Sequence, residues 1–159
     1  MDSNRHIIIM RVDNKPGVLS RIAGLFTRRG YNIDSLVTGP TEDPDVYHMT
    51  ITVIGEREII DLLIRQLGRV MEVVEVSCAD GGDYVTSELM LLRVSCPLSR
   101  RPEMLKLTEI IKVDVASVDS DSMVLRVIGD DLRHRTVIEA FREFGIERVI
   151  RSGPVSIEI

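Results

Sequence analysis

The sequence predicts an α+β protein built from two tandem ferredoxin-like βαββαβ units. Strand-like apolar runs alternate with amphipathic helical stretches, the order of these elements occurs twice, and a small, acidic, glycine-containing segment separates the two occurrences. The chain has 159 residues and a mass of 17.9 kDa, which suits two small domains. We place the first domain at residues 1–78, a linker at 79–85 and the second domain at 86–159.

The first domain shows the βαββαβ order in full. Strands are predicted where β-branched residues cluster or alternate with polar residues, and helices where apolar residues recur every three to four positions. Gly30 and Gly68 are typical helix stops, and Pro16 suits the first turn of the first helix. The predicted strands are 7–12, 33–38, 47–53 and 70–77, and the predicted helices are 18–29 and 59–67.

The second domain repeats this order with a shorter hairpin loop and a different first helix. Met49–Gly55 and Met123–Gly129 share their framework of apolar positions at one fixed offset, but identity elsewhere is weak. The repeat is therefore one of topology. The predicted strands are 88–95, 113–118, 123–128 and 146–150, and the predicted helices are 102–111 and 136–144.

Composition excludes several classes of function. The formal net charge is −5, the isoelectric point is near 5.2, aromatic residues are 4% and Trp is absent. Nucleic-acid binders need a positive surface and, for single strands, aromatic side chains that stack on bases, so we expect no nucleic-acid partner. No apolar run is long enough to cross a bilayer, and the start lacks a signal-peptide pattern. We therefore expect a cytoplasmic protein that does not associate with a membrane.

The residues that could carry catalysis or bind metal are scattered. Cys78 and Cys96 form neither a disulfide framework nor a CxxC pair, and we expect both to be buried, inert thiols. His6, His48 and His134 lack the spacing of metal ligands, and surface or half-buried positions are expected for them. Nucleophile elbows, P-loops and dinucleotide fingerprints are absent from the sequence. We predict no catalytic residue and no metal site.

The turn between the first strand and the first helix is the most informative segment. It reads Asn14-Lys15-Pro16-Gly17-Val18-Leu19, and a helix N-terminus offers unpaired N–H groups and a partial positive charge to a carboxylate. Gly17 would let a ligand approach the backbone, and Asn14 could both accept from an ammonium and donate to a carboxylate. The residues alone leave a second interpretation open, in which Asn14 only caps the helix and Pro16-Gly17 only makes the turn.

Beyond this turn the sequence resembles a known family. The residues that carry the resemblance are NKPGVLSRIAGLF at 14–26, RGYNIDSL at 29–36, Met49–Ile51, Gln66-Leu67, FGIE at 144–147 and RSG at 151–153. They resemble the small regulatory subunits of acetolactate synthase, also called acetohydroxyacid synthase. The first domain is similar to an ACT domain, an amino-acid-sensing module of the βαββαβ fold, and the second to an ACT-like regulatory domain.

The resemblance implies a regulatory function without catalysis. Such a subunit binds the catalytic large subunit, raises its activity, and confers feedback inhibition by valine or a related branched-chain amino acid. It implies no cofactor in this chain, since thiamine diphosphate, FAD and magnesium belong to the large subunit.

The resemblance also implies an effector site at the interface of a homodimer, where we expect two N-terminal sheets to pair. The effector carboxylate would lie at the helix N-terminus, its ammonium near Asn oxygens, and its isopropyl group against Val18, Leu19 or Ile33. The implied site residues are Asn14, Gly17, Val18 and Leu19 from one chain, facing Asn32 and Ile33 from the other.

Two alternatives belong to other classes of protein. The first is a free-standing ACT-type amino-acid sensor or regulator, for which the sequence contains no recognisable output domain such as a helix-turn-helix. The second is an acylphosphatase-like enzyme, which shares the topology. That class holds phosphate in a glycine-rich first loop with an Arg, and Asp13–Val18 lacks this composition.

Overall fold

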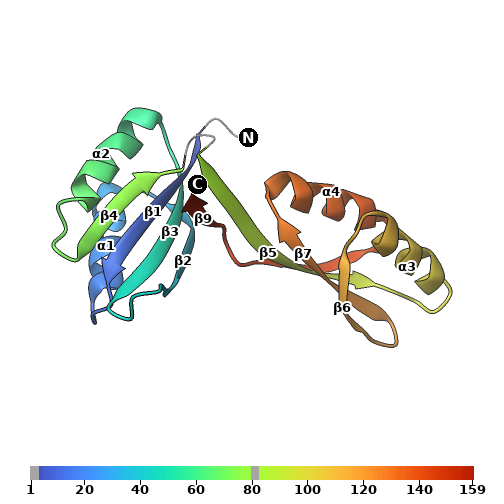
Figure 1. The fold of residues 1–159 in the computed structure, drawn as a ribbon. Helices are drawn as coiled ribbons and strands as arrows, with labels where there is room; N and C mark the ends of the chain where they lie inside the picture. The colour runs from blue at the N-terminus through green and yellow to red at the C-terminus, as the bar shows by residue number, and fades with distance from the viewer. Residues whose placement is uncertain (1–3, 80–82) are drawn as a thin grey trace. The chain divides into compact units, whose positions relative to one another are not determined.

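The computed structural model describes residues 4–79 and 83–159, which form two compact units (Figure 1). The first unit consists of the chain up to Val85 together with Gly153–Ile159. The second unit consists of Thr86–Ser152. Each unit contains an antiparallel sheet with two helices over one face, which confirms the predicted α+β class and the tandem βαββαβ order.

The first unit contains a four-stranded sheet in the order β2-β3-β1-β4. Apolar side chains of β1 alternate inward and outward, so that one face of the sheet meets both helices and forms the core. The elements are β1 (Arg5–Asp13), α1 (Val18–Arg29), β2 (Ile33–Pro40), β3 (Val46–Ile54), α2 (Arg57–Leu67) and β4 (Val73–Cys78). The core residues are Ile8, Met10, Val12, Val18, Ile22, Phe26, Met49, Ile51, Val53, Ile60, Leu63 and Leu67.

The second unit repeats the arrangement with the strand order β6-β7-β5-β8. Its helices cover one face of the sheet, and its core shares no buried residue with the core of the first unit. The elements are β5 (Tyr84–Ser95), α3 (Arg101–Ile110), β6 (Asp114–Val118), β7 (Ser122–Gly129), α4 (Asp131–Phe141), the 3-10 helix η1 (Arg142–Phe144) and β8 (Ile146–Arg151). The core residues are Met90, Leu92, Val94, Cys96, Met104, Val113, Met123, Leu125, Val127, Val137, Phe141 and Phe144.

The last seven residues depart from the predicted domain boundary. The prediction assigned 86–159 to one domain, but Gly153–Ile159 belongs to the first compact unit. This segment contains a strand absent from the prediction, β9 (Val155–Glu158), which pairs with β5. The N–H of Ile159 donates to the carbonyl of Asp83 at 2.9 Å. The signal was present in the sequence, since Val155–Ile159 alternates apolar and polar residues directly after the turn residues Ser152-Gly153-Pro154, but the prediction did not use it.

Other boundaries shift by a few residues. Strand β5 begins at Tyr84 rather than at 88, so the predicted linker 79–85 overlaps it, and residues 80–82 of that linker lie outside the described residues. Strand β4 begins at Val73 rather than at 70, because consecutive turns follow α2. Helix α4 begins at Asp131 rather than at 136, because Asp130 caps it by accepting from the N–H of Arg133 at 2.8 Å.

The buried histidines were not predicted. His6 is 6% exposed and His134 is fully buried, whereas surface or half-buried positions were expected. Cys78 and Cys96 form no disulfide with each other; Cys96 is buried as predicted, and Cys78 is only half-buried. Across residues 4–79 and 83–159, no group of three or more His, Cys, Asp or Glu side chains is placed to hold a metal ion. No helix in the same described ranges is long and apolar enough to span a membrane.

Candidate functional site

The turn between β1 and α1 is built around a left-handed glycine. Strand β1 ends at Asp13 and α1 begins at Val18. Pro16 therefore precedes the helix, whereas the sequence analysis placed it in the first helical turn. Gly17 is the N-cap residue, with φ 86° and ψ −9°. Residues that carry a side chain rarely adopt these backbone angles, which explains why glycine stands at this position.

The N-terminus of α1 is open and has no side-chain cap. No side chain caps it by hydrogen bonding, and its first turn contains no acidic residue. The N–H groups of Leu19 and Ser20 have no acceptor inside the helix, since the first N–H groups of any helix lack one. A Cβ at Gly17 would meet no atom of the described chain within 4 Å. The space in front of the helix therefore presents backbone donors and partial positive charge to a ligand.

Asn14 belongs to this turn but does not cap the helix. Its side-chain Nδ2 donates to the carbonyl of Pro44 at 3.1 Å, and its backbone N–H donates to the carbonyl of Asp45 at 2.8 Å. Both bonds tie the turn to the β2–β3 hairpin loop. The interpretation in which Asn14 only caps the helix is therefore wrong. In the described part of the chain its Oδ1 has no hydrogen-bond partner and can accept from an ammonium group.

The two apolar residues after Gly17 differ in their availability. Val18 is 4% exposed and packs in the core of the first unit, so its side chain cannot form a wall of an open site. Leu19 is 46% exposed on the outer side of the same turn. Of the two, only Leu19 can contact an apolar group of a ligand in front of the helix.

Asn32 and Ile33 lie at the opposite end of α1. Asn32 is exposed after the helix C-cap Gly30, and Ile33 is half-buried where β2 starts, paired with Val53. A helix of 12 residues is about 18 Å long, so a single chain does not bring these residues to the turn around Gly17. The six predicted site residues can meet only if two chains come together, and that arrangement remains a prediction.

The charges beside the turn form local pairs. Lys15 Nζ lies 2.5 Å from Asp13 Oδ2, and this hydrogen bond, reinforced by the charge of Asp13, raises the pKa of Lys15. Arg21, on the first turns of α1, pairs with Glu72. The turn thus combines backbone donors, the Asn14 Oδ1 acceptor and an exposed Leu, groups that suit the carboxylate, the ammonium and the aliphatic part of an amino acid, respectively.

The second unit contains a charged cluster that the sequence did not reveal. Arg151 Nε donates to Glu88 Oε2 at 3.0 Å and its guanidinium also lies 3.0 Å from Asp131 Oδ1. Glu88 is 6% exposed, and the buried His134 places Nδ1 3.3 Å from the same Oε2. The hydrogen bond to Glu88 raises the pKa of Arg151. The cluster ties the end of β8 and the middle of β5 to α4. Arg151 belongs to the RSG run at 151–153, which is the only part of this cluster that the sequence analysis singled out.

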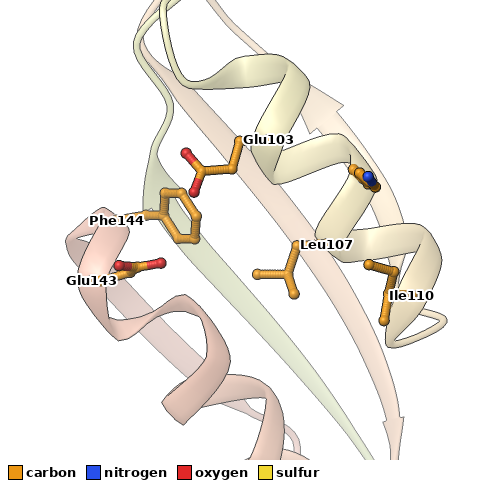
Figure 2. Close-up of a pocket in the computed structure, with 6 residues that line it drawn as sticks. Glu103, Leu107, Ile110, Glu143 and Phe144 are labelled. Carbon is orange, nitrogen blue, oxygen red and sulfur yellow. The ribbon is translucent and has the colours of Figure 1, made fainter.

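A shallow hollow on the second unit lies between α3 and η1 (Figure 2). Leu107, Ile110 and Phe144 line it with apolar groups, and the carboxylates of Glu103 and Glu143 lie near its rim. The guanidinium of Arg100 lies 4.1 Å from the Phe144 ring centroid. Among the described residues that line it, Lys106 is the one donor side chain, beside two carboxylates, so the hollow is a weaker candidate than the turn for binding the carboxylate of an effector.

Comparison with known proteins identifies the family. The family model described as AHAS small subunit-like ACT domain matches residues 8–75, and the model described as small subunit of acetolactate synthase matches residues 87–159. A probable acetolactate synthase small subunit from Archaeoglobus fulgidus is 40% identical over 153 residues, or 96% of each chain. The chain belongs to the acetolactate synthase small-subunit family. The resemblance seen in the sequence is thereby confirmed.

Other members of the small-subunit family extend the likeness. The acetolactate synthase small subunit of Aquifex aeolicus is 38% identical over 154 residues, covering 96% of this chain and 80% of that protein. The crystal structure of the acetolactate synthase small subunit from Thermotoga maritima matches with a TM-score of 0.85 and 28% identity, over 98% of this chain and 97% of that one. The likeness therefore spans both ACT-like units.

Proposed function

We propose that this chain is the regulatory subunit of acetolactate synthase. In this proposal it binds the catalytic large subunit, activates it and makes it sensitive to feedback inhibition by valine or a related branched-chain amino acid. The observation that carries the proposal is the 40% identity to a small subunit over 96% of both chains. The chain itself catalyses nothing, works in the cytoplasm, and leaves thiamine diphosphate, FAD and magnesium to the large subunit.

The proposed effector site joins two copies of the first unit. The carboxylate of the amino acid lies in front of α1, where Leu19 and Ser20 offer N–H groups and Gly17 leaves open space. The ammonium lies near Asn14 Oδ1, and the aliphatic side chain contacts Leu19. Asn32 and Ile33 come from the second copy, because their own chain holds them at the far end of α1.

Such a site selects amino acids as a class. It hydrogen-bonds both polar ends of the ligand, so a compound that lacks either end leaves buried donors or acceptors unpaired. One methylene in the apolar part changes the binding free energy by only about 1–3 kcal/mol, so valine, leucine and isoleucine compete.

Calorimetry with valine tests the site. Gly17→Asn is the variant of choice, because asparagine adopts the left-handed conformation more readily than most residues with a side chain. The asparagine side chain would occupy the open space in front of α1. We expect a loss of valine binding of about tenfold or more. Gly24→Ala is the matched control, because it adds a methyl group to the same helix, 3.5 Å from Arg28 Nη1 and away from its N-terminus. Its valine affinity should equal that of the wild type.

Asn32→Ala tests the contribution of the second copy. Losing a charge-assisted hydrogen bond should weaken valine binding by roughly 1.5–3 kcal/mol, or about tenfold to a hundredfold. In the reconstituted holoenzyme, activation should persist in both variants while inhibition by valine is reduced. Unchanged valine affinity in Gly17→Asn and Asn32→Ala would place the effector elsewhere. Failure of the wild-type chain to bind the large subunit would favour a free-standing sensor.

A further inference from the structure

The second sheet has an outer face, which we define as the face opposite α3 and α4. Met90, Leu92 and Val94 point to the helices and are fully buried, so the alternate residues of β5 lie on the outer face. The cross-strand pairs Leu89 with Ile128 and Leu91 with Ile150 extend that face across β7 and β8. The outer face is therefore defined by register as well as by exposure.

An aliphatic patch occupies one end of the outer face. Leu89 and Leu91 are 38% and 36% exposed, and Ile128 and Ile150 are 66% and 55% exposed. They come from three neighbouring strands and adjoin one another by register, so they are not isolated surface residues. A contiguous aliphatic group on a solvent-facing sheet is typical of an interaction site.

Arginines border this patch on the same face. Arg126 lies opposite Leu91, and Arg93 lies opposite Arg148. Arg93 pairs with Glu147 at 2.9 Å and Arg126 with Asp114 at 3.7 Å, whereas Arg148 has no ion-pair partner in the described part of the chain. Placing Arg148 directly opposite another arginine is unfavourable in the isolated chain. A partner that supplies a carboxylate there would relieve the repulsion.

The matching face of the first sheet is already covered. Thr50 and Thr52, which face away from α1 and α2, are fully buried. Gly153 packs against Val37 of the same face so closely that a Cβ would lie 2.8 Å from its Cγ2. The C-terminal segment of the chain thus covers polar residues in the first unit, while the exposed Ile128 and Ile150 of the second unit have no such cover among the described residues.

We propose that the outer face of the second sheet binds the catalytic large subunit, on a surface that presents aliphatic side chains flanked by carboxylates. This inference rests on the proposed function, which supplies the partner. Charge favours that partner over a second copy of the chain. Self-packing would bring the arginines of two copies together, while the carboxylates of Asp114 and Glu147 already accept from Arg126 and Arg93. A buried guanidinium without a counter-ion is strongly unfavourable.

Binding of the purified large subunit to full-length variants tests the inference. Ile128→Glu should raise the Kd about tenfold or more, because it puts a charge into the centre of the contact. Ile110→Glu is the matched control, since Ile110 is 67% exposed, on α3, against 66% for Ile128. Its Kd should stay within about twofold of the wild-type value, as expected for a surface change outside the contact.

A second pair of variants covers the possibility that Ile128→Glu does not fold. Arg148→Glu should weaken binding of the large subunit in a salt-dependent way, whereas Arg142→Glu, an exposed arginine of η1, should not. Circular dichroism and valine calorimetry on each variant report the state of both units.

The outcomes separate the two proposals. A wild-type chain that does not bind the large subunit overturns the proposed function and this inference together. Wild-type binding that Ile128→Glu and Arg148→Glu leave unchanged overturns the inference alone. If these variants instead abolish self-association in sedimentation while large-subunit binding persists, the face joins two copies of the chain, and the inference is also overturned.

Discussion

The two units share one topology but differ in how they treat the sheet face away from their helices. In the first unit this face carries threonines, and the chain's own C-terminal segment packs on it. In the second unit the face carries aliphatic and arginine side chains and is exposed. Charge differs as well: the first unit has nine basic and 14 acidic residues, and the second has 11 of each. The repeated fold thus has this face covered in the first unit and exposed in the second.

The N-termini of α1 and α4 also differ between the two units. Helix α4 of the second unit is capped by Asp130, whose side chain accepts from one N–H of the first turn. Helix α1 of the first unit begins at a left-handed glycine without a side-chain cap. An uncapped helix start leaves its donors to water or to a ligand. Of these two helix starts, α1 therefore leaves more donors open to water or to a ligand.

The largest expected effect comes from truncating the core of either unit. Phe26 and Phe141 are at most 1% exposed and lie in separate cores. Phe26→Ala and Phe141→Ala should each lower the free energy of unfolding by about 3–5 kcal/mol. Hydrogen exchange should show faster amide exchange mainly in the unit that carries the substitution. Equal acceleration of amide exchange in both units would mean that the two units unfold together, and would contradict their description as independent units.

The next effect concerns the cover over the first sheet. Gly153 has φ 86°, and a Cβ there would lie 2.8 Å from Val37 Cγ2. Gly153→Ala should combine a backbone penalty of about 1–2 kcal/mol with a packing penalty of about 1–3 kcal/mol. Thermal unfolding and hydrogen exchange of β2 and β3 measure the result.

Gly30→Ala is the control for the backbone penalty alone. Gly30 has φ 72°, and a Cβ there meets nothing within 4 Å. Its loss of stability should stay near about 1–2 kcal/mol. Equal losses in Gly30→Ala and Gly153→Ala would show that the C-terminal segment is not held against β2.

A smaller effect is expected at the caps. Asp130→Ala removes the side-chain oxygen that accepts from Arg133 N–H at 2.8 Å, and should destabilise the second unit by about 1 kcal/mol. Glu56→Ala changes the N-cap residue of α2, which makes no side-chain cap bond, and should leave stability nearly unchanged. Urea unfolding of the two variants distinguishes them. A similar loss in both would argue against a specific cap at Asp130.

The smallest effect should appear in the acid limb of the stability curve, where the free energy of unfolding falls as the pH decreases. Burial would raise the pKa of Asp131, but hydrogen bonds from Arg135 and Arg151 outweigh it and lower the pKa below its usual 3.8. The charged carboxylate therefore stabilises the fold above pH 3.8, and this contribution is lost as the pH falls through the lower folded value. Asp131→Asn should flatten the acid limb in urea titrations between about pH 2 and 6.

Glu42 in the first unit gives the comparison for this titration. A hydrogen bond from its own backbone N–H and one from Arg11 lower the pKa of Glu42, but the group is exposed to solvent. Exposed ion pairs contribute little to stability, so Glu42→Gln should change the acid limb less than Asp131→Asn does. A larger change in Glu42→Gln than in Asp131→Asn would contradict the expectation that the exposed Glu42 contributes less to stability than Asp131 does.

Most of the fold could be predicted because its signals are local. The alternation in β1 and the three-to-four spacing in α1 each arise from one element that buries one face. The stops at Gly30 and Gly68 were also visible, since both are helix C-cap residues. The strand β9 was missed although a turn signal and an alternating run mark it; only its pairing with β5 depends on residues far away in the sequence. The burial of His134 escaped prediction, since its neighbour Glu88 lies far away in the sequence, on β5.

The candidate site likewise has features that the sequence predicts and features that depend on tertiary contacts. Residue types and their spacing alone specify a strand, a glycine turn and a helix start at 13–18, because these are properties of neighbouring residues. Only the tertiary structure decides that Asn14 bonds to Pro44 rather than to the helix start. Only tertiary structure, too, places Asn32 at the far end of α1 and brings Gly153 onto β2. Local propensity acts over a few residues, whereas these contacts join segments whose separation in sequence carries no pattern.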